Sequence, residues 1–72
     1  MEEINCIGLC CPQPIIKIAK AIANVSPGDS LILLADDPLI LLDLRAWARM
    51  TGNEVTPISE TRFKVTRRNQ NV

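Results

Sequence analysis

The sequence predicts a two-layer α/β sandwich of order βαβαββ, in which a four-stranded mixed sheet carries two helices on one face. Two segments have apolar residues at helical spacing, short apolar stretches alternate with them, and Pro, Gly, Asp and Asn separate the segments. The chain has 72 residues, of which 47% are hydrophobic. We therefore expect residues 1–72 to form a single domain.

The first half of the chain predicts a strand, a helix and a second strand. Residues 4–7 suit a short strand that ends at Gly8. A helix of about three turns follows, with Pro12 at its first position. Its apolar side chains are spaced by three and four residues, at Ile15, Ile18, Ala19 and Ile22. After a turn at residues 26–29, the unbroken apolar run within residues 30–35 predicts a central strand with both faces covered.

The second helix is predicted by its termini as well as by its periodicity. Asp36 and Asp37 are expected to cap it, with Pro38 at its first position. Gly52 provides the left-handed residue that commonly ends a helix. The buried stripe consists of Ile40, Leu44, Trp47 and Ala48.

The last two strands are expected at residues 54–58 and 62–66. A turn at residues 59–61 joins them as a hairpin. Alternation of apolar and polar residues points Phe63 and Val65 toward the core.

The charge balance limits the classes of partner. Eight basic and eight acidic side chains cancel, so we expect no direct nucleic-acid partner and no anionic membrane partner. Four basic residues do cluster near the end, and we interpret them as a solvated strand face and tail. The alternative is a nucleic-acid or regulatory module with strongly salt-dependent binding. These residues are Arg62, Lys64, Arg67 and Arg68.

Membrane insertion and secretion are not expected either. The apolar runs fall far short of the roughly 20 residues that span a bilayer. The start Met-Glu-Glu does not resemble a signal peptide. We therefore expect a cytoplasmic protein.

Three cysteines, Cys6, Cys10 and Cys11, crowd one end of the chain. Their odd number and position favour free thiols in a reducing compartment over a disulfide framework. A Cys6–Cys10 disulfide would require the chain to fold back at Gly8. The chain has no histidine, which removes Cys–His catalysis and makes a zinc site unfavourable, so no metal is expected.

Cys11 is the candidate nucleophile, because Cys11-Pro12-Gln13-Pro14 places a thiol at the start of the first helix. Neither proline has an N–H, so Gln13 is expected to offer the free amide. The helix dipole favours a thiolate at this end. The alternative is a buried structural cysteine. A thiolate can exchange sulfur without a base or metal, so no cofactor is expected.

Several motifs resemble the TusA (SirA-like) sulfur-carrier family over nearly the whole chain. They are Gly-Leu-Cys-Cys-Pro-Gln-Pro at residues 8–14, Pro27-Gly28-Asp29, Ala35-Asp36-Asp37-Pro38, and Trp47-Ala48 ahead of Gly52. The resemblance implies the βαβαββ sandwich and a persulfide on Cys11, with Gly8 and Leu9 shaping the preceding loop.

The resemblance also implies a carrier that takes part in persulfide transfer rather than a multiple-turnover enzyme by itself. Its expected donor is a cysteine desulfurase or another sulfurtransferase, and its expected acceptor is a partner protein cysteine. The pathways implied are tRNA thiolation, cofactor synthesis or sulfur oxidation.

The chain departs from the family pattern at three positions. Asn5 stands where aspartate is common, Cys10 where a basic or polar residue is usual, and Asn53 where histidine is common. The thiol of Cys10 raises an alternative function, a redox or regulatory interaction module in which Cys10 and Cys11, with or without Cys6, cycle between thiol and disulfide.

Two segments carry more apolar side chains than one core stripe needs. They are residues 31–34, whose alternate side chains face the uncovered side of the sheet, and residues 39–42 at the start of the second helix. Exposed apolar area of this kind marks contact sites, so we expect a homodimer or a docked partner here. The alternative is that these residues complete a small core.

Overall fold

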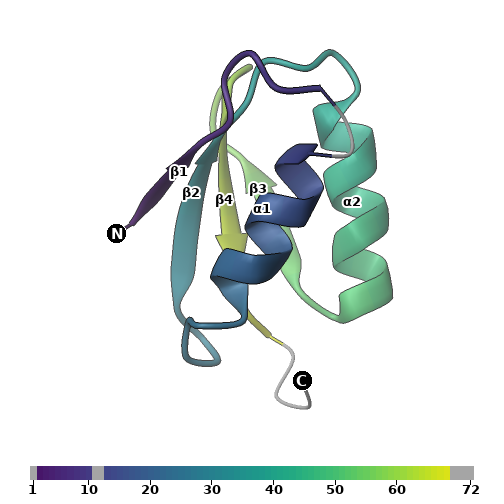
Figure 1. Cartoon of the computed structure of the whole chain (residues 1–72). Coiled ribbons are helices and arrows are strands. Elements are labelled where there is room, and N and C mark those ends of the chain that lie inside the picture. The colour runs from purple at the N-terminus through teal and green to yellow at the C-terminus, as the bar shows by residue number, and fades with distance from the viewer. Residues whose placement is uncertain (1, 11–12, 69–72) are drawn as a thin grey trace.

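The computed structural model describes residues 2–10 and 13–68, and it confirms the predicted α/β class (Figure 1). The elements follow the predicted order: β1 (Glu3–Asn5), α1 (Gln13–Ile22), β2 (Ser30–Leu34), α2 (Ile40–Thr51), β3 (Glu54–Pro57) and β4 (Arg62–Thr66). The four strands form one sheet in the order β1-β2-β4-β3. β1 runs parallel to β2, and β4 runs antiparallel to both β2 and β3.

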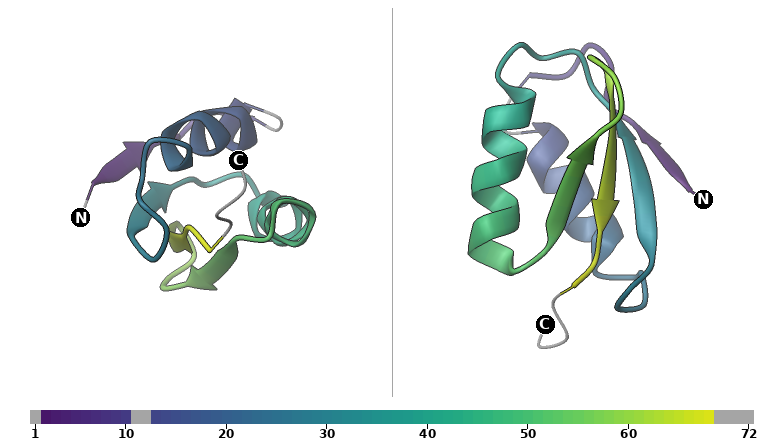
Figure 2. Two further views of the ribbon diagram at one scale, coloured as in Figure 1. Left: turned by 90° about the horizontal axis from the view of Figure 1, so that it is seen from below. Right: turned by 180° about the vertical axis from the view of Figure 1, so that it is seen from behind.

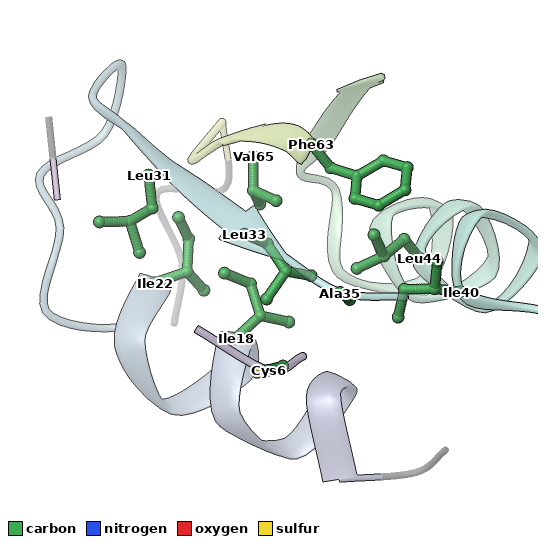
Figure 3. Close-up of a cluster of buried hydrophobic side chains, with 10 residues drawn as sticks. All are labelled: Cys6, Ile18, Ile22, Leu31, Leu33, Ala35, Ile40, Leu44, Phe63 and Val65. Atoms are coloured by element: carbon green, nitrogen blue, oxygen red, sulfur yellow. The ribbon is translucent and has the colours of Figure 1, made fainter. Parts of the chain in front are cut away.

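The core lies between the sheet and the two helices, which pack on the same face (Figures 2 and 3). In the sheet, Leu33 pairs with Phe63 and Leu31 pairs with Val65, so these side chains share one face. The prediction that Phe63 and Val65 point inward is confirmed. The buried cluster consists of Cys6, Ile18, Ile22, Leu31, Leu33, Ala35, Ile40, Leu44, Phe63 and Val65.

The other face of the sheet carries polar side chains around a covered apolar centre. Ile32 lies there between Glu3 and Lys64 and is only 8% exposed. Arg62 and Glu3 form an ion pair of 2.7 Å beside it. Ile32 is therefore part of the packed structure, in agreement with a central strand covered on both faces and in contrast to the apolar contact surface expected from residues 31–34.

Several element boundaries differ from the prediction. β1 ends at Asn5 rather than at residue 7, because the Asn5 side-chain oxygen accepts a hydrogen bond from the Ile7 N–H at 3.0 Å and turns the chain. β2 ends at Leu34 and β3 ends at Pro57, each one residue earlier than expected. β4 occupies its predicted range.

α2 begins at Ile40, so the prediction that Pro38 occupies its first position is wrong. The Asp37 carboxylate accepts a hydrogen bond from the Leu39 N–H at 3.0 Å, which closes a turn before the helix instead of capping it. At the other end, Gly52 adopts the predicted left-handed conformation with φ +78°, and its N–H donates to the Ala48 carbonyl.

Trp47 was expected in the buried stripe of α2, but it is half-buried. It lines a small cavity between the two helices together with Ala19, Ala23 and Arg67. Its ring is therefore shared between the core and the groove that separates α1 from α2. In the described part of the chain, neither helix has the length and hydropathy needed to cross a bilayer.

Candidate functional site

Three loops meet at one end of the sheet, at the top of Figure 1. Because β1 and β2 are parallel, the segments that follow them, residues 6–10 and 35–39, leave the sheet at the same end. The β3–β4 turn joins them there, since the Ala35 N–H donates to the Thr61 carbonyl at 2.9 Å. The loop that carries Cys10 therefore lies at the same end of the sheet as the two other loops.

The cysteine-bearing loop starts with a tight turn. The Cys6 N–H extends the sheet by donating to the Leu34 carbonyl at 2.7 Å, and the Leu9 N–H donates back to the Cys6 carbonyl at 3.1 Å. Gly8 lies inside this turn with φ +84°. A Cβ at Gly8 would meet no atom within 4 Å, so glycine is required by the backbone conformation and not by a lack of space.

Asp36 fixes this turn from the segment that follows β2. Its carboxylate accepts a hydrogen bond from the Gly8 N–H at 2.9 Å. The interpretation of Asp36 as a helix cap is therefore wrong, since its side chain serves the cysteine loop while Asp37 closes the turn before α2. Sequence reasoning missed this contact, and the one signal for it was the joint occurrence of the two motifs in the family resemblance.

The described cysteines have different environments. Cys6 is 0% exposed in the core, and burial raises the pKa of its thiol, an effect that the charge of Lys17 partly offsets. Cys10 is exposed, and both thiols are free rather than joined in a disulfide. Cys11 and Pro12 lie outside the described residues, so the site is defined here by its neighbours.

The start of α1 differs from the expected arrangement. The Gln13 N–H donates to the Cys10 carbonyl at 2.9 Å, so the prediction that this amide is free is wrong. The next residue, Pro14, is fully buried. On the other side, Leu9 is half-buried against the core. The chain is therefore anchored by apolar contacts at Leu9 and Pro14, before and after the cysteine pair in the sequence, and the positive end of the α1 dipole lies at Gln13.

The basic residues near the end of the chain have structural roles. Arg62 pairs with Glu3, and Arg68 lies 3.5 Å from the Glu54 carboxylate. The Arg67 guanidinium donates to two carbonyls of the segment after α1, at 3.2 Å from Ala23 O and 2.6 Å from Val25 O. Arg62, Arg67 and Arg68 thus each have an intramolecular partner, and Lys64 lies beside Ile32 on the polar face.

Asn53, one of the positions that departs from the family pattern, has a comparable structural role. Its amide nitrogen donates to the Thr51 hydroxyl at 3.1 Å. Its side-chain oxygen accepts from the Arg68 N–H at 3.1 Å. The side chain therefore links the end of α2 to the segment that follows β4.

A depression of about 430 Å³ is lined in part by Asp36, the residue that holds the cysteine loop. It lies between the start of α2 and the β3–β4 turn, and its lining includes apolar Phe63 and the carboxylates of Asp36 and Glu60. Among residues 2–10 and 13–68, no three Cys, Asp or Glu side chains approach closely enough to hold a metal ion. This end of the molecule therefore presents the exposed thiol of Cys10 close to the start of α1, which buried Pro14 holds in place.

Fold and site together define a small α/β protein that presents a cysteine loop at the end of its sheet. Comparison with known proteins identifies its family. The model of the sulfurtransferase TusA family matches residues 2–68. A protein of Archaeoglobus fulgidus described as a "putative sulfur carrier protein" is 34% identical over 55 residues, which cover 76% of this chain and 71% of that protein. The chain belongs to the TusA family of sulfur carriers, a membership that implies interaction with sulfur donors and acceptors.

Proposed function

We propose that the protein accepts sulfane sulfur as a persulfide on Cys11 and passes it to a cysteine of a partner protein. The observation that carries the proposal is the anchoring of the cysteine segment. Asp36 holds Gly8 at 2.9 Å on one side, and buried Pro14 fixes the start of α1 on the other. Anchors of this kind favour a reactive group that is presented in a defined place.

The proposed chemistry consists of two thiol exchange steps. The Cys11 thiolate attacks the terminal sulfur of a persulfide on the donor, so that a new S–S bond forms on Cys11 and the donor cysteine leaves as a thiolate. An acceptor thiolate then attacks the terminal sulfur on Cys11, and Cys11 leaves as a thiolate. Neither step changes the total oxidation state, so no external oxidant is required.

The start of α1 supports the leaving-group side of this chemistry. A thiolate near a helix N-terminus is favoured over the thiol because the unpaired end of the helix carries partial positive charge. The same stabilisation makes Cys11 a better leaving group when the sulfur moves on. Because the Gln13 amide is already bonded to Cys10, the dipole of α1 as a whole carries this effect in our proposal.

The proposal includes the partners and the setting of the reaction. The donor is a cysteine desulfurase or another sulfurtransferase, and residues 1–72 act as one carrier domain. We place the reaction in a reducing compartment such as the cytoplasm, because the resting state needs a free thiol.

The alternative is a dithiol switch that uses Cys10 and Cys11. The exposure of Cys10 favours it, since a switch needs an accessible second thiol. Cys6 is disfavoured as a member, because it is buried in the core and the pKa of its thiol is raised. Cys10 is therefore the residue that distinguishes the two functions.

Intact-protein mass spectrometry tests the proposal. The full chain, Cys11→Ser and Cys10→Ser are incubated with a cysteine desulfurase and cysteine, with and without a reductant. We expect a reducible gain of about 32 Da in the full chain and in Cys10→Ser, and no gain in Cys11→Ser.

The contrary result has a distinct mass. A loss of about 2 Da on oxidation of the full chain, absent in Cys10→Ser and unaccompanied by any sulfur gain, would support the dithiol switch instead. A gain of sulfur that persists in Cys11→Ser would overturn the assignment of the nucleophile.

A further inference from the structure

The outer side of α2 carries an apolar stripe that the fold does not use. Leu39 is 59% exposed, Leu42 is 68% exposed and Met50 is 85% exposed, and Ala46 between them is exposed as well. These four residues, the α2 outer stripe, are spaced by three or four positions and so share one side of the helix. Figure 2 shows α2 at one lateral end of the molecule, with no described element beyond it.

The stripe is separate from the core-facing side of the same helix. Ile40, Leu44 and Ala48 are the buried residues of α2 and lie on the opposite side of the helix. A helix that is apolar on two sides exceeds what a two-layer fold requires. The excess is not explained by stability, since the exposed side chains gain little from folding.

The charges next to the stripe indicate the chemistry of a partner. Arg45 and Arg49 are exposed on α2 beside the stripe. In the described part of the chain they form no ion pair, whereas Arg62 and Arg68 are paired with carboxylates. Within α2 the two arginines are opposed by one carboxylate, that of Asp43.

We propose that the α2 outer stripe is the docking surface for a partner-protein helix whose apolar side chains are flanked by carboxylates. The apolar stripes of the two helices pack together, and small Ala46 allows close approach. Arg45 and Arg49 pair with the carboxylates of the partner. Because α2 carries two arginines and one aspartate, two copies of this chain would bring like charges together across this surface, so a second copy is not the occupant.

The proposed docking surface goes beyond the proposed sulfur transfer. The experiment that tests it measures peptide binding and does not depend on sulfur transfer. The probe is a helical peptide of about 18 residues with a leucine stripe flanked by glutamates. The matched control peptide has lysine in place of each glutamate. Each peptide is titrated at low salt into the full ¹⁵N-labelled protein, and amide chemical shifts are followed.

We expect the glutamate peptide to shift the amides of Leu42, Ala46, Arg49 and Met50, and to bind at least about tenfold more tightly than the lysine peptide. The double variant Arg45→Glu/Arg49→Glu should reverse this preference. Lys64→Glu, a charge change on the other face of the sheet, should leave it unchanged. Far-UV circular dichroism confirms that each variant is folded.

Equal binding of the two peptides, or shifts confined to residues outside α2, would overturn the proposal. So would two other results. Shifts of the α2 amides on concentrating the protein alone would assign the stripe to a second copy. Binding to anionic phosphatidylglycerol vesicles that is lost in the double variant, without a preference for the glutamate peptide, would assign it to a membrane surface.

Discussion

The carboxylate of Asp36 accepts a hydrogen bond from the backbone N–H of Gly8 at 2.9 Å, across 28 residues of sequence. Gly8 precedes the cysteine pair, and Asp36 follows the central strand β2. The position of the cysteine loop therefore depends on a side chain that belongs to another part of the fold. This contact also gives a physical reason for the joint occurrence of the two motifs.

Replacing Asp36 with alanine removes the acceptor and should free the turn at Gly8. We expect faster hydrogen exchange of the Gly8 amide, a loss of about 1 kcal/mol in the free energy of unfolding, and slower sulfur loading of Cys11. Asp36→Asn keeps an oxygen acceptor, so its Gly8 exchange rate, stability and rate of sulfur loading should stay close to those of the unmodified protein. NMR hydrogen exchange and the mass assay measure them.

The control for this prediction is Glu60→Ala, which removes an exposed carboxylate from the same end of the molecule. This substitution should leave the hydrogen-exchange rate of the Gly8 amide unchanged. If Asp36→Ala left the exchange of Gly8 at the rate of the unmodified protein, the hydrogen bond would have no role in holding the loop.

Two glycines of the chain form a matched pair for testing the loop. Gly8 and Gly28 have φ +84° and +94°, and at neither position would a Cβ meet an atom within 4 Å. Alanine at either should cost about 1 kcal/mol of stability through backbone strain alone. Gly8→Ala should in addition slow sulfur loading, whereas Gly28→Ala should load at the normal rate. Equal loading of the two variants would contradict a role for the Gly8 turn.

The buried thiol of Cys6 predicts a pH dependence of stability. Its pKa is raised in the folded state, so above the ordinary thiol pKa of about 8.5 the unfolded state releases a proton that the folded state keeps. The unfolded state then binds fewer protons, and stability falls as pH rises through this range. At pH values below the ordinary thiol pKa, Cys6 is protonated in both states and its full contribution to stability is present.

Urea unfolding between neutral and alkaline pH measures this effect. Cys6→Ala should show a shallower alkaline decrease than the unmodified protein, while Cys10→Ala, which changes an exposed thiol, should keep the original slope. The slopes are compared rather than the absolute stabilities, because Cys6→Ala also leaves a small cavity. Identical slopes in all three proteins would contradict the prediction.

The contacts of Arg67 predict that two adjacent arginines differ in importance. Arg67→Ala removes hydrogen bonds to Ala23 and Val25 and should reduce the free energy of unfolding by about 1–2 kcal/mol. Arg68→Ala removes an exposed ion pair with Glu54 and should cost less than about 0.5 kcal/mol. Chemical denaturation of both variants measures the difference, and equal losses would show that the Arg67 hydrogen bonds add nothing beyond surface charge.

The sequence was sufficient for most of the fold because the fold depends on local patterns. The spacing of Ile15, Ile18 and Ile22 by three and then four residues defines α1, and the left-handed requirement at the end of α2 is met by Gly52. Alternation in β4 correctly placed Phe63 and Val65 in the core. Each of these signals lies within one element, so it is visible before any tertiary contact is known.

The errors arise where tertiary contacts compete with local rules. Asp36 and Pro38 have the pattern of a helix start, but the Asp36 carboxylate bonds to Gly8 and the helix begins at Ile40. The position of the Gln13 amide in the first turn suits a side-chain cap, yet this amide donates to the Cys10 carbonyl. The site depends on these long-range and loop contacts, and it was therefore predicted less completely than the fold.

The outermost strands of the sheet determine how another protein can approach. β1 has three residues and β3 has four, ending at Pro57, which has no N–H to donate. Short edge strands are poor templates for adding a strand from another chain, and a proline in an edge strand weakens the template further. Backbone pairing at the sheet edges is thus disfavoured, and recognition of this protein falls to side chains on its loops and helices.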